Sequence, residues 1–190
     1  MDLATAVNTV IKNRRSVFPP MYNGDKIDDT IINQILENAL WAPNHRKTEP
    51  WSFKVFTGDS LQSLSDYSGN WYKTNTPEDK FSEMKFEKTK KKALQSSHVI
   101  ALIMNRHEDL VPEWEEIAAV ACAVQNMWLT AAAYGVGAYW SSPKYAIEGD
   151  TFFNLESNQK CLGLFYLGIP VEGLQLNAER TALDEKVEWV

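Results

Sequence analysis

Two adjacent arginines and a serine, Arg14, Arg15 and Ser16, follow an N-terminal segment whose apolar residues recur at helical spacing. Guanidinium groups bind phosphate through planar, charge-assisted hydrogen bonds, and a serine hydroxyl suits a polyol chain. The three residues therefore have the chemistry of a phosphate site. A structural interpretation stays open beside it, because arginines also stabilise the C-terminal ends of helices through the helix dipole.

A second polar segment, from Ala42 to Trp51, joins a predicted helix to a predicted strand. It contains Pro43, Asn44 and His45, so it offers an amide and a titratable imidazole on a short loop that prolines hold. Such a loop can bind a ligand, but it can equally cap the helix and expose a solvated basic patch.

Two further segments carry polar groups where a simple core would not need them. An aromatic strand ends in Trp140, Ser141 and Ser142, and the tail carries Arg180 ahead of a hydrophobic end. Taken alone, the first could be a core strand that leads into a turn, and the second a tail that packs its tryptophan.

The motifs of several other chemistries do not occur in the sequence. There is no GxxxxGKS/T phosphate loop, no GxSxG nucleophile elbow and no HExxH zinc motif. The three histidines are scattered without Cys or Asp partners at ligand spacing, so we expect no metal site. Gly135 and Gly137 follow a helix, which predicts a left-handed helix end and a strand start instead of a dinucleotide fingerprint.

The composition is that of an ordinary globular protein of 190 residues, which suits a single domain over residues 1–190. The net charge of -6 disfavours nucleic acid as a partner, because nucleic-acid-binding domains are usually basic. Cys122 and Cys161 form no CxxC pair, so we expect two buried free thiols in a reducing cytoplasm.

No segment has the pattern of a signal peptide or a membrane anchor. Residues 1–15 lack an apolar core followed by a small-residue cleavage site. The longest apolar stretch, residues 117–140, contains Gln125 and Asn126 in its middle. This favours a buried helix that runs into a strand over a membrane span, and we expect no membrane partner.

The hydrophobic pattern predicts the elements that would position these segments. Helices are expected over residues 3–13, from Asp28 or Asp29 to Pro43, and over 113–134; strands are expected over 51–56, 99–104, 136–141 and 162–168, with an irregular tail from 171. The polar segment 59–95 is predicted to be helical, and its run from Lys88 to Lys92 to be a solvated helix face. This order predicts a single α+β domain.

In this order and spacing, the segments resemble the nitroreductase family, and the similarity covers nearly the whole chain. Arg14 to Ser16 resembles the family's first flavin-contacting segment, and Ala42 to Trp51 resembles the loop APxHxxxxPW of its short branch. Gln125 to Gly137 is similar to its central helix and glycine turn, and Leu167 to Pro170 to the end of its last core strand. Each motif is weak alone, but the four in the correct order are specific.

The resemblance implies an α+β nitroreductase-like fold, with a central mostly antiparallel sheet flanked by helices, in a domain-entwined homodimer with FMN at the subunit interface. The family's flavin contacts fall on Arg14, Arg15, Ser16, Trp41, Pro43, Asn44, His45, Trp140, Ser141, Ser142 and Arg180. A nicotinamide-cofactor contact is implied for Thr130, Ala131, Ala132, Ala133, Tyr134 and Gly135. In family members, the contacts at the positions of Trp41 and His45 come from the partner subunit.

The activity that the resemblance implies is that of an FMN-dependent NAD(P)H oxidoreductase. It would reduce a nitroaromatic, quinone or enone-type small molecule in two hydride transfers, with the flavin carrying the chemistry. No side chain need then act as a nucleophile or base, so we assign no catalytic residue. We expect His45 to orient the flavin through a hydrogen bond, and the alternative is that it donates a proton. Arg14 or Arg15 would stabilise the negative charge of the reduced flavin. The alternatives are a related flavin reaction such as dehalogenation or flavin breakdown, a flavin-binding protein with little turnover, and a cofactor-free interaction module.

The substrate end of the site departs most from the family pattern. Trp41 stands where the short branch often has arginine, Glu49 where it often has glutamine, and Ser141 where it often has a bulky basic residue.

The segment 59–95 lies where family members vary. We expect it to form a lid or pocket rim in which Trp71 and Tyr72 touch a flat substrate. A surface helix that packs its own aromatic residues is the alternative.

Overall fold

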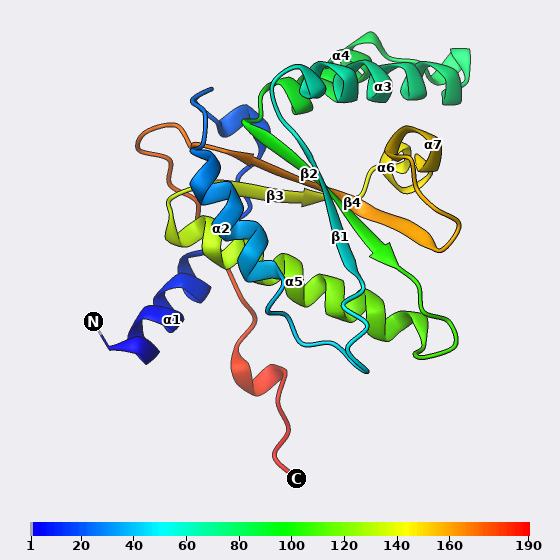
Figure 1. Cartoon of the computed structure of the whole chain (residues 1–190). Helices are drawn as coiled ribbons and strands as arrows, with labels where there is room; N and C mark the ends of the chain where they lie inside the picture. The colour runs from blue at the N-terminus through cyan, green and yellow to red at the C-terminus, as the bar shows by residue number, and fades with distance from the viewer. Residues whose placement is uncertain (1) are drawn as a thin grey trace.

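The computed structural model describes residues 2–190, and its centre is a four-stranded sheet in the order β1-β2-β4-β3 (Figure 1). The strands are β1 (Trp51–Phe56), β2 (His98–Asn105), β3 (Gly137–Ser141) and β4 (Gln159–Gly168). Every neighbouring pair is antiparallel, which agrees with the predicted sheet. β4 begins three residues before the predicted start, because Gln159 and Lys160 are polar but still pair with β2.

Helices cover both faces of the sheet (Figure 1). The α-helices are α1 (Leu3–Asn13), α2 (Asp29–Ala39), α3 (Asp59–Asn75), α4 (Glu83–Leu94), α5 (Glu113–Ala133), α6 (Lys144–Ile147) and α7 (Asp150–Phe153). The short 3-10 helices are η1 (Pro19–Met21), η2 (Glu78–Lys80) and η3 (Leu183–Glu185). Helices α2 and α5 lie on one face, whereas α3, α4, α6 and α7 lie on the other.

The alternation of β2 builds two separate cores, because successive side chains of a strand point to opposite faces. Ile100, Leu102 and Met104 join the core beneath α2 and α5. Val99, Ala101 and Ile103 join the second core, beneath α3, α4 and α6. A continuous apolar run therefore marks a strand that is buried on both faces.

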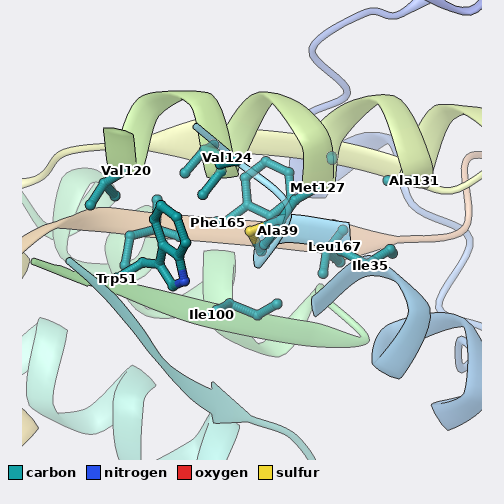
Figure 2. Packing of buried hydrophobic residues seen from close by; sticks show 14 of the residues in the cluster. Ile35, Ala39, Trp51, Ile100, Val120, Val124, Met127, Ala131, Phe165 and Leu167 are labelled. Carbon is teal, nitrogen blue, oxygen red and sulfur yellow. The ribbon is translucent and has the colours of Figure 1, made fainter. Parts of the chain in front are cut away.

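Helix α5 packs its apolar stripe on the first core (Figure 2). Val120, Val124, Met127 and Ala131 recur at three- and four-residue spacing, and all are at most 1% exposed. Phe165 of β4 lies opposite them. Helix α5 is also apolar and long enough to cross a membrane by length and composition, but this stripe packs on the sheet.

Helix α5 also leaves apolar groups exposed. Trp114 is 67% and Ile117 41% exposed. Cys122 is also exposed, so the prediction of two buried thiols is wrong for this residue and correct for Cys161. Cys122 misses the core because it stands one position before Ala123, which faces the sheet.

The polar segment 59–95 forms two helices, α3 and α4, which pack side by side and are joined through η2. Gly69 of α3 permits this contact, because a Cβ there would lie 2.7 Å from Cγ of Lys90. The chain after β4 is irregular apart from η3, as predicted, and leaves the body of the molecule (Figure 1). Its Trp189 is 91% exposed.

Candidate functional site

The segment after α1 runs along the outer edge of β3. Ser16 forms a parallel bridge with Ala138, and the Val17 amide donates to the Ala138 carbonyl over 3.0 Å. Arg14 is the residue that ends α1. The predicted phosphate-binding residues therefore lie beside the strand that carries Trp140 and Ser141.

Arg14 is a half-buried cation, and one of its guanidinium nitrogens is buried without a hydrogen-bond partner among residues 2–190. Its Cζ lies 4.4 Å from the centre of the Trp128 ring, and its Nη1 has no partner among residues 2–190. Burial, followed by the nearby charges of Arg180 and Arg15, lowers the pKa of Arg14. A desolvated guanidinium among other cations is costly unless an anion binds there.

Arg15 instead binds backbone oxygens. Its Nε donates to the Leu176 carbonyl over 3.0 Å, and its Nη1 donates to the Lys12 carbonyl over 2.6 Å. This residue thus ties the tail to the end of α1. Leu176 precedes Arg180 by four residues, so the tether holds the third arginine near Arg14.

The end of β3 presents one aromatic residue and two hydroxyls. Trp140 is half-buried against the first core, and its Nε1 donates to the Leu162 carbonyl over 3.1 Å. Ser141 is half-buried and Ser142 is exposed. Gly163 allows this approach of β3, because a Cβ there would lie 2.5 Å from the Ser141 carbonyl oxygen.

The loop from Ala42 to Trp51 has unusual backbone geometry. Arg46, Lys47 and Glu49 all have positive φ, at 54°, 55° and 41°. Such conformations are strained in residues other than glycine and often occur in functional loops. The Asn44 side chain accepts a hydrogen bond from the Glu49 amide over 3.1 Å, which closes the loop on itself.

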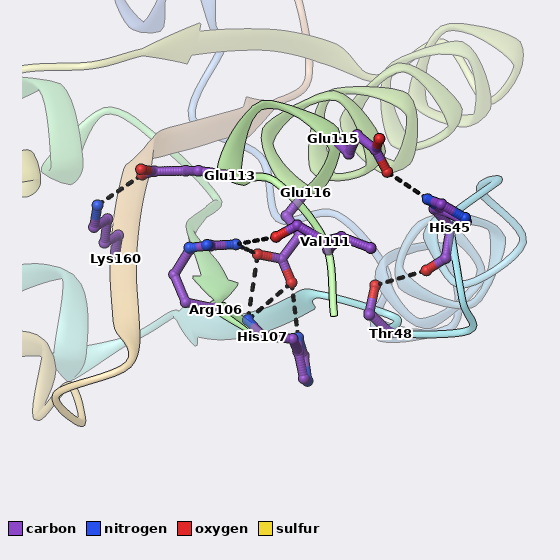
Figure 3. Close-up of polar contacts among 9 residues, drawn as sticks. All are labelled: His45, Thr48, Arg106, His107, Val111, Glu113, Glu115, Glu116 and Lys160. Carbon is purple, nitrogen blue, oxygen red and sulfur yellow. Dashed lines mark hydrogen bonds and ion pairs between the residues drawn. The ribbon is translucent and has the colours of Figure 1, made fainter. Parts of the chain in front are cut away.

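His45 of this loop is tied to the start of α5 (Figure 3). Its Nδ1 lies 2.6 Å from Oε2 of Glu115. Trp128, under Arg14, lies thirteen residues further along the same helix, or about 20 Å at the rise of an α-helix. One chain therefore does not bring His45 to Arg14, and Trp41 beside this loop is 82% exposed.

A buried carboxylate next to Glu115 was not predicted from the sequence. Glu116 is 1% exposed and accepts hydrogen bonds from Arg106 Nη1 and from the His107 amide and Nδ1 (Figure 3). It fixes the start of α5 to the end of β2. No local pattern indicates this cluster, because its partners lie about ten residues apart in an irregular connection.

The predicted nicotinamide stretch is the last turn of α5 and the turn after it. Thr130 is buried, accepts from Asn38 Nδ2 over 2.9 Å and donates to the Asn126 carbonyl over 2.8 Å. Ala131 is part of the core and Ala132 is half-buried, whereas Ala133, Tyr134 and Gly135 are exposed. The predicted left-handed helix end is confirmed by the φ of 72° at Gly135.

The two predicted lid residues, Trp71 and Tyr72, both contact other parts of the chain. Trp71 is half-buried against the second core. The Tyr72 hydroxyl accepts from the Ser82 amide over 3.2 Å, and its ring lies 5.5 Å from that of Phe81.

A cavity of about 760 Å³ opens between η1, β3 and α4, next to the segment that follows Ser16. One wall is aromatic and apolar: Phe18, Pro19, Pro20 and Tyr139. The α4 wall is mostly cationic or polar: Met84, Glu87, Lys88, Lys91, Lys92 and Gln95.

Two contacts connect residues that line the cavity. The Phe18 and Tyr139 rings lie 4.4 Å apart, and Nζ of Lys92 lies 5.9 Å from the Tyr139 ring. The run from Lys88 to Lys92 was expected to be a solvated face, but part of it lines this cavity. The sequence gives no local signal for this, because the facing wall comes from distant segments.

The antiparallel sheet with helices on both faces gives this chain a nitroreductase-like fold. A model described as "Nitroreductase family" matches residues 11–169. The chain belongs to the nitroreductase family, which confirms the resemblance seen in the sequence.

Individual relatives are similar to this chain over most or all of its length. "Putative NAD(P)H nitroreductase YfhC" of Bacillus subtilis is 25% identical over 96% of this chain and 93% of its own. A solved nitroreductase-like family protein from Bacillus cereus is 28% identical, with a TM-score of 0.79 over 100% of this chain and 98% of that chain. The FMN-dependent nitroreductase NfnB of Mycobacterium smegmatis, solved with NADPH, is 17% identical with a TM-score of 0.79 over 100% of both chains and shows the shared fold.

Proposed function

We propose that the chain is an FMN-dependent NAD(P)H oxidoreductase that acts as a homodimer on small-molecule acceptors of the nitroaromatic, quinone or enone type. The observation that carries the proposal is the half-buried Arg14 guanidinium, whose buried Nη1 lacks a partner among residues 2–190. It lies four residues before Phe18, which lines an aromatic, cationic cavity. The FMN and NADPH named for the M. smegmatis relative are consistent with such a site.

The residues along the edge of β3 fit the parts of FMN in order. Arg14 and Arg180 would hold the phosphate, because they are the cations whose mutual repulsion an anion would relieve. Ser16, Ser141 and Ser142 offer hydroxyls for the ribityl chain, and Trp140 supports that end of β3. The segment from Arg14 to Phe18 spans up to about 13 Å, which carries the site from the arginines to the cavity.

The cavity would receive the flavin ring and the molecule that stacks on it. When bound, FMN supplies a carrier that takes a hydride from NAD(P)H and gives it to an acceptor. Lys92 is the cation that this cavity offers for the negative charge of the reduced carrier, since Arg15 is bound to carbonyl groups. No side chain is required as a base, because protons can come from water.

A second subunit would complete the site. His45 is bound about 20 Å along α5 from the residue under Arg14, so a copy of the chain must supply the imidazole if it contacts the flavin. Helix α1 buries none of its residues, and a groove of about 410 Å³ between α1, α2 and α5 exposes Val7 and Ile11 at 49% each. Exposed apolar surface of this kind is typical of obligate dimer interfaces.

The nicotinamide cofactor would approach the exposed end of α5. Ala133, Tyr134 and Gly135 are accessible there, while Thr130 and Ala131 hold the helix on the core. Trp71 and Tyr72 would not touch the substrate themselves. They would affect its binding only by holding α3 in place relative to α4. We place the enzyme in the cytoplasm, where NAD(P)H is available.

The proposal is tested by anaerobic steady-state turnover of the purified yellow protein with NADH and NADPH against nitroaromatic, quinone and enone acceptors. Turnover of at least one class with one donor is the expected result. A protein that binds FMN but turns over none of them would be a flavin-binding protein. A colourless protein that takes up no added FMN would contradict the flavin site.

A further inference from the structure

We propose that this site selects flat acceptors that carry an anionic substituent, a carboxylate or a sulfonate, and that Lys88 and Lys91 hold that substituent. The inference rests on the proposed function, since it names the substrate class of the same cavity. It concerns the side of the cavity formed by α4, which the flavin assignments above leave unused except at Lys92.

The spacing of the lysines on α4 directs them to one place. Lys88, Lys91 and Lys92 are separated by three and four residues, so they share one face of the helix. All three line the cavity of about 760 Å³. The opposite wall carries the Phe18 and Tyr139 rings, so a flat molecule meets an aromatic surface on one side and ammonium groups on the other.

The side chains that line this cavity carry a net positive charge, whereas the whole chain is negative. The whole sequence has a net charge of -6, yet three lysines and a single carboxylate, Glu87, line the cavity. Within residues 2–190, Lys90 of the same helix pairs with Asp66 over 3.7 Å, but no ion pair forms at Lys88, Lys91 or Lys92. A concave cationic surface on an acidic protein concentrates anionic ligands.

The three lysines differ in depth. Lys92 is half-buried over the Tyr139 ring, whereas Lys88 and Lys91 are exposed at the rim. A ring stacked inside the cavity would therefore direct a substituent outward to the two rim lysines. An ammonium group is a flexible point charge, so it can pair with a carboxylate, a sulfonate or the phosphate of NADPH.

A matched ligand pair tests this directly. Binding of 4-nitrobenzoate and of the neutral 4-nitrobenzamide is measured by calorimetry on the oxidised FMN-loaded protein, with no electron donor present. The double variant Lys88→Gln with Lys91→Gln is compared with Lys85→Gln, which removes one charge from an exposed residue of α4 outside the cavity. KM is then measured for both acceptors with the donor present, and for NADH and NADPH with the acceptor present.

The expected result is selective. The wild-type protein binds 4-nitrobenzoate more tightly than the amide, and the double variant weakens the benzoate by about five- to tenfold while the amide changes less than twofold. Lys85→Gln leaves both unchanged. The preference for the benzoate also falls as salt is raised.

Three results would overturn the inference. One is equal wild-type affinity for the two ligands, and another is an equal loss of benzoate binding in Lys85→Gln, which would indicate general surface charge. The third is a double variant that raises KM for NADPH but not for NADH and leaves benzoate binding intact, because the rim lysines would then serve the donor's phosphate. Reduction by NAD(P)H without charge selectivity would leave the proposed oxidoreductase function standing, so the two failures are distinguishable.

Discussion

Arg14 and Trp128 form a stacked pair in which Cζ of the guanidinium lies 4.4 Å from the centre of the indole ring. Neither Nη1 of the arginine nor Nε1 of the tryptophan has a hydrogen-bond partner among residues 2–190, and both atoms are buried. The pair joins the end of α1 to α5, but burying these two nitrogens without partners costs the free energy of their hydration. Such a cost is typical of a site prepared for a ligand.

The first prediction is that Arg14→Met separates ligand binding from stability. The methionine keeps an apolar chain over Trp128 but removes the half-buried charge and its unpaired nitrogen, so the FMN-free protein should be equally or more stable. Its affinity for FMN should fall by about ten- to a hundredfold, because a charge-assisted hydrogen bond is lost. Thermal unfolding without FMN and fluorescence titration with FMN measure the two effects. Unchanged FMN affinity would show that Arg14 does not bind the phosphate.

The second prediction concerns the buried carboxylate at the start of α5. Glu116→Gln should destabilise the protein by about 3–5 kcal/mol, because Arg106 would keep a buried charge without its partner. Denaturant unfolding measures the change. Glu113→Gln is the control, since its pair with Lys160 is solvent-exposed and its loss should change little. Equal effects of the two substitutions would contradict a structural role specific to Glu116.

The third prediction is a loss of stability in mild acid that depends on His98. Burial lowers the pKa of His98, and the charge of Lys26 adds to this, while Asp29 at 3.7 Å opposes it. The unfolded chain, with an ordinary histidine pKa of about 6.5, then binds a proton that the folded chain resists. Stability is complete above that value and falls as the pH is lowered below it, by at most about 1.4 kcal/mol per pH unit.

The contribution of His98 is isolated by comparison with His98→Gln. Urea unfolding of both proteins is measured between about pH 7 and pH 5, the range in which an ordinary histidine gains its proton. As the pH falls, the free energy of unfolding should decrease more in the wild-type protein than in His98→Gln. Parallel curves would contradict the prediction.

The fourth prediction tests the dimer. Val7→Asp puts a charge into the groove between α1, α2 and α5 and should shift the protein toward a monomer with weaker FMN binding. Val55→Asp is the control, because Val55 is also exposed, at 40%, but lies on β1 outside this groove. Sedimentation with detection of flavin absorbance reports mass and FMN together. A wild-type monomer with FMN bound would contradict a shared site.

The sequence was sufficient to predict the central sheet and the long helix. The apolar pattern identifies β2 and α5, because the side chains that each element buries recur at regular spacing within its own sequence. It failed at Cys122, where a small apolar residue stands just outside the buried stripe.

The parts of the site that the sequence missed depend on long-range contacts. The hydrogen bond from Arg15 to the Leu176 carbonyl joins residues from nearly opposite ends of the chain. The contact of Lys92 with the Tyr139 ring likewise joins segments that only the fold brings together. Glu116 is similar, since a charged residue in the first turn of a helix usually faces solvent. Residue types alone suggested Arg14 and His45 as site residues. Only the structure shows that their partners, Trp128 and Glu115, lie far apart on α5.

We propose that this chain passes electrons from NAD(P)H to a small molecule through bound FMN. The most direct measurement is anaerobic stopped-flow absorbance of the FMN-loaded protein mixed first with NADH or NADPH and then with an acceptor. We expect one donor to bleach the flavin band and the acceptor to restore it within a turnover. If neither donor bleaches the flavin band, the protein does not pass electrons from NAD(P)H through FMN.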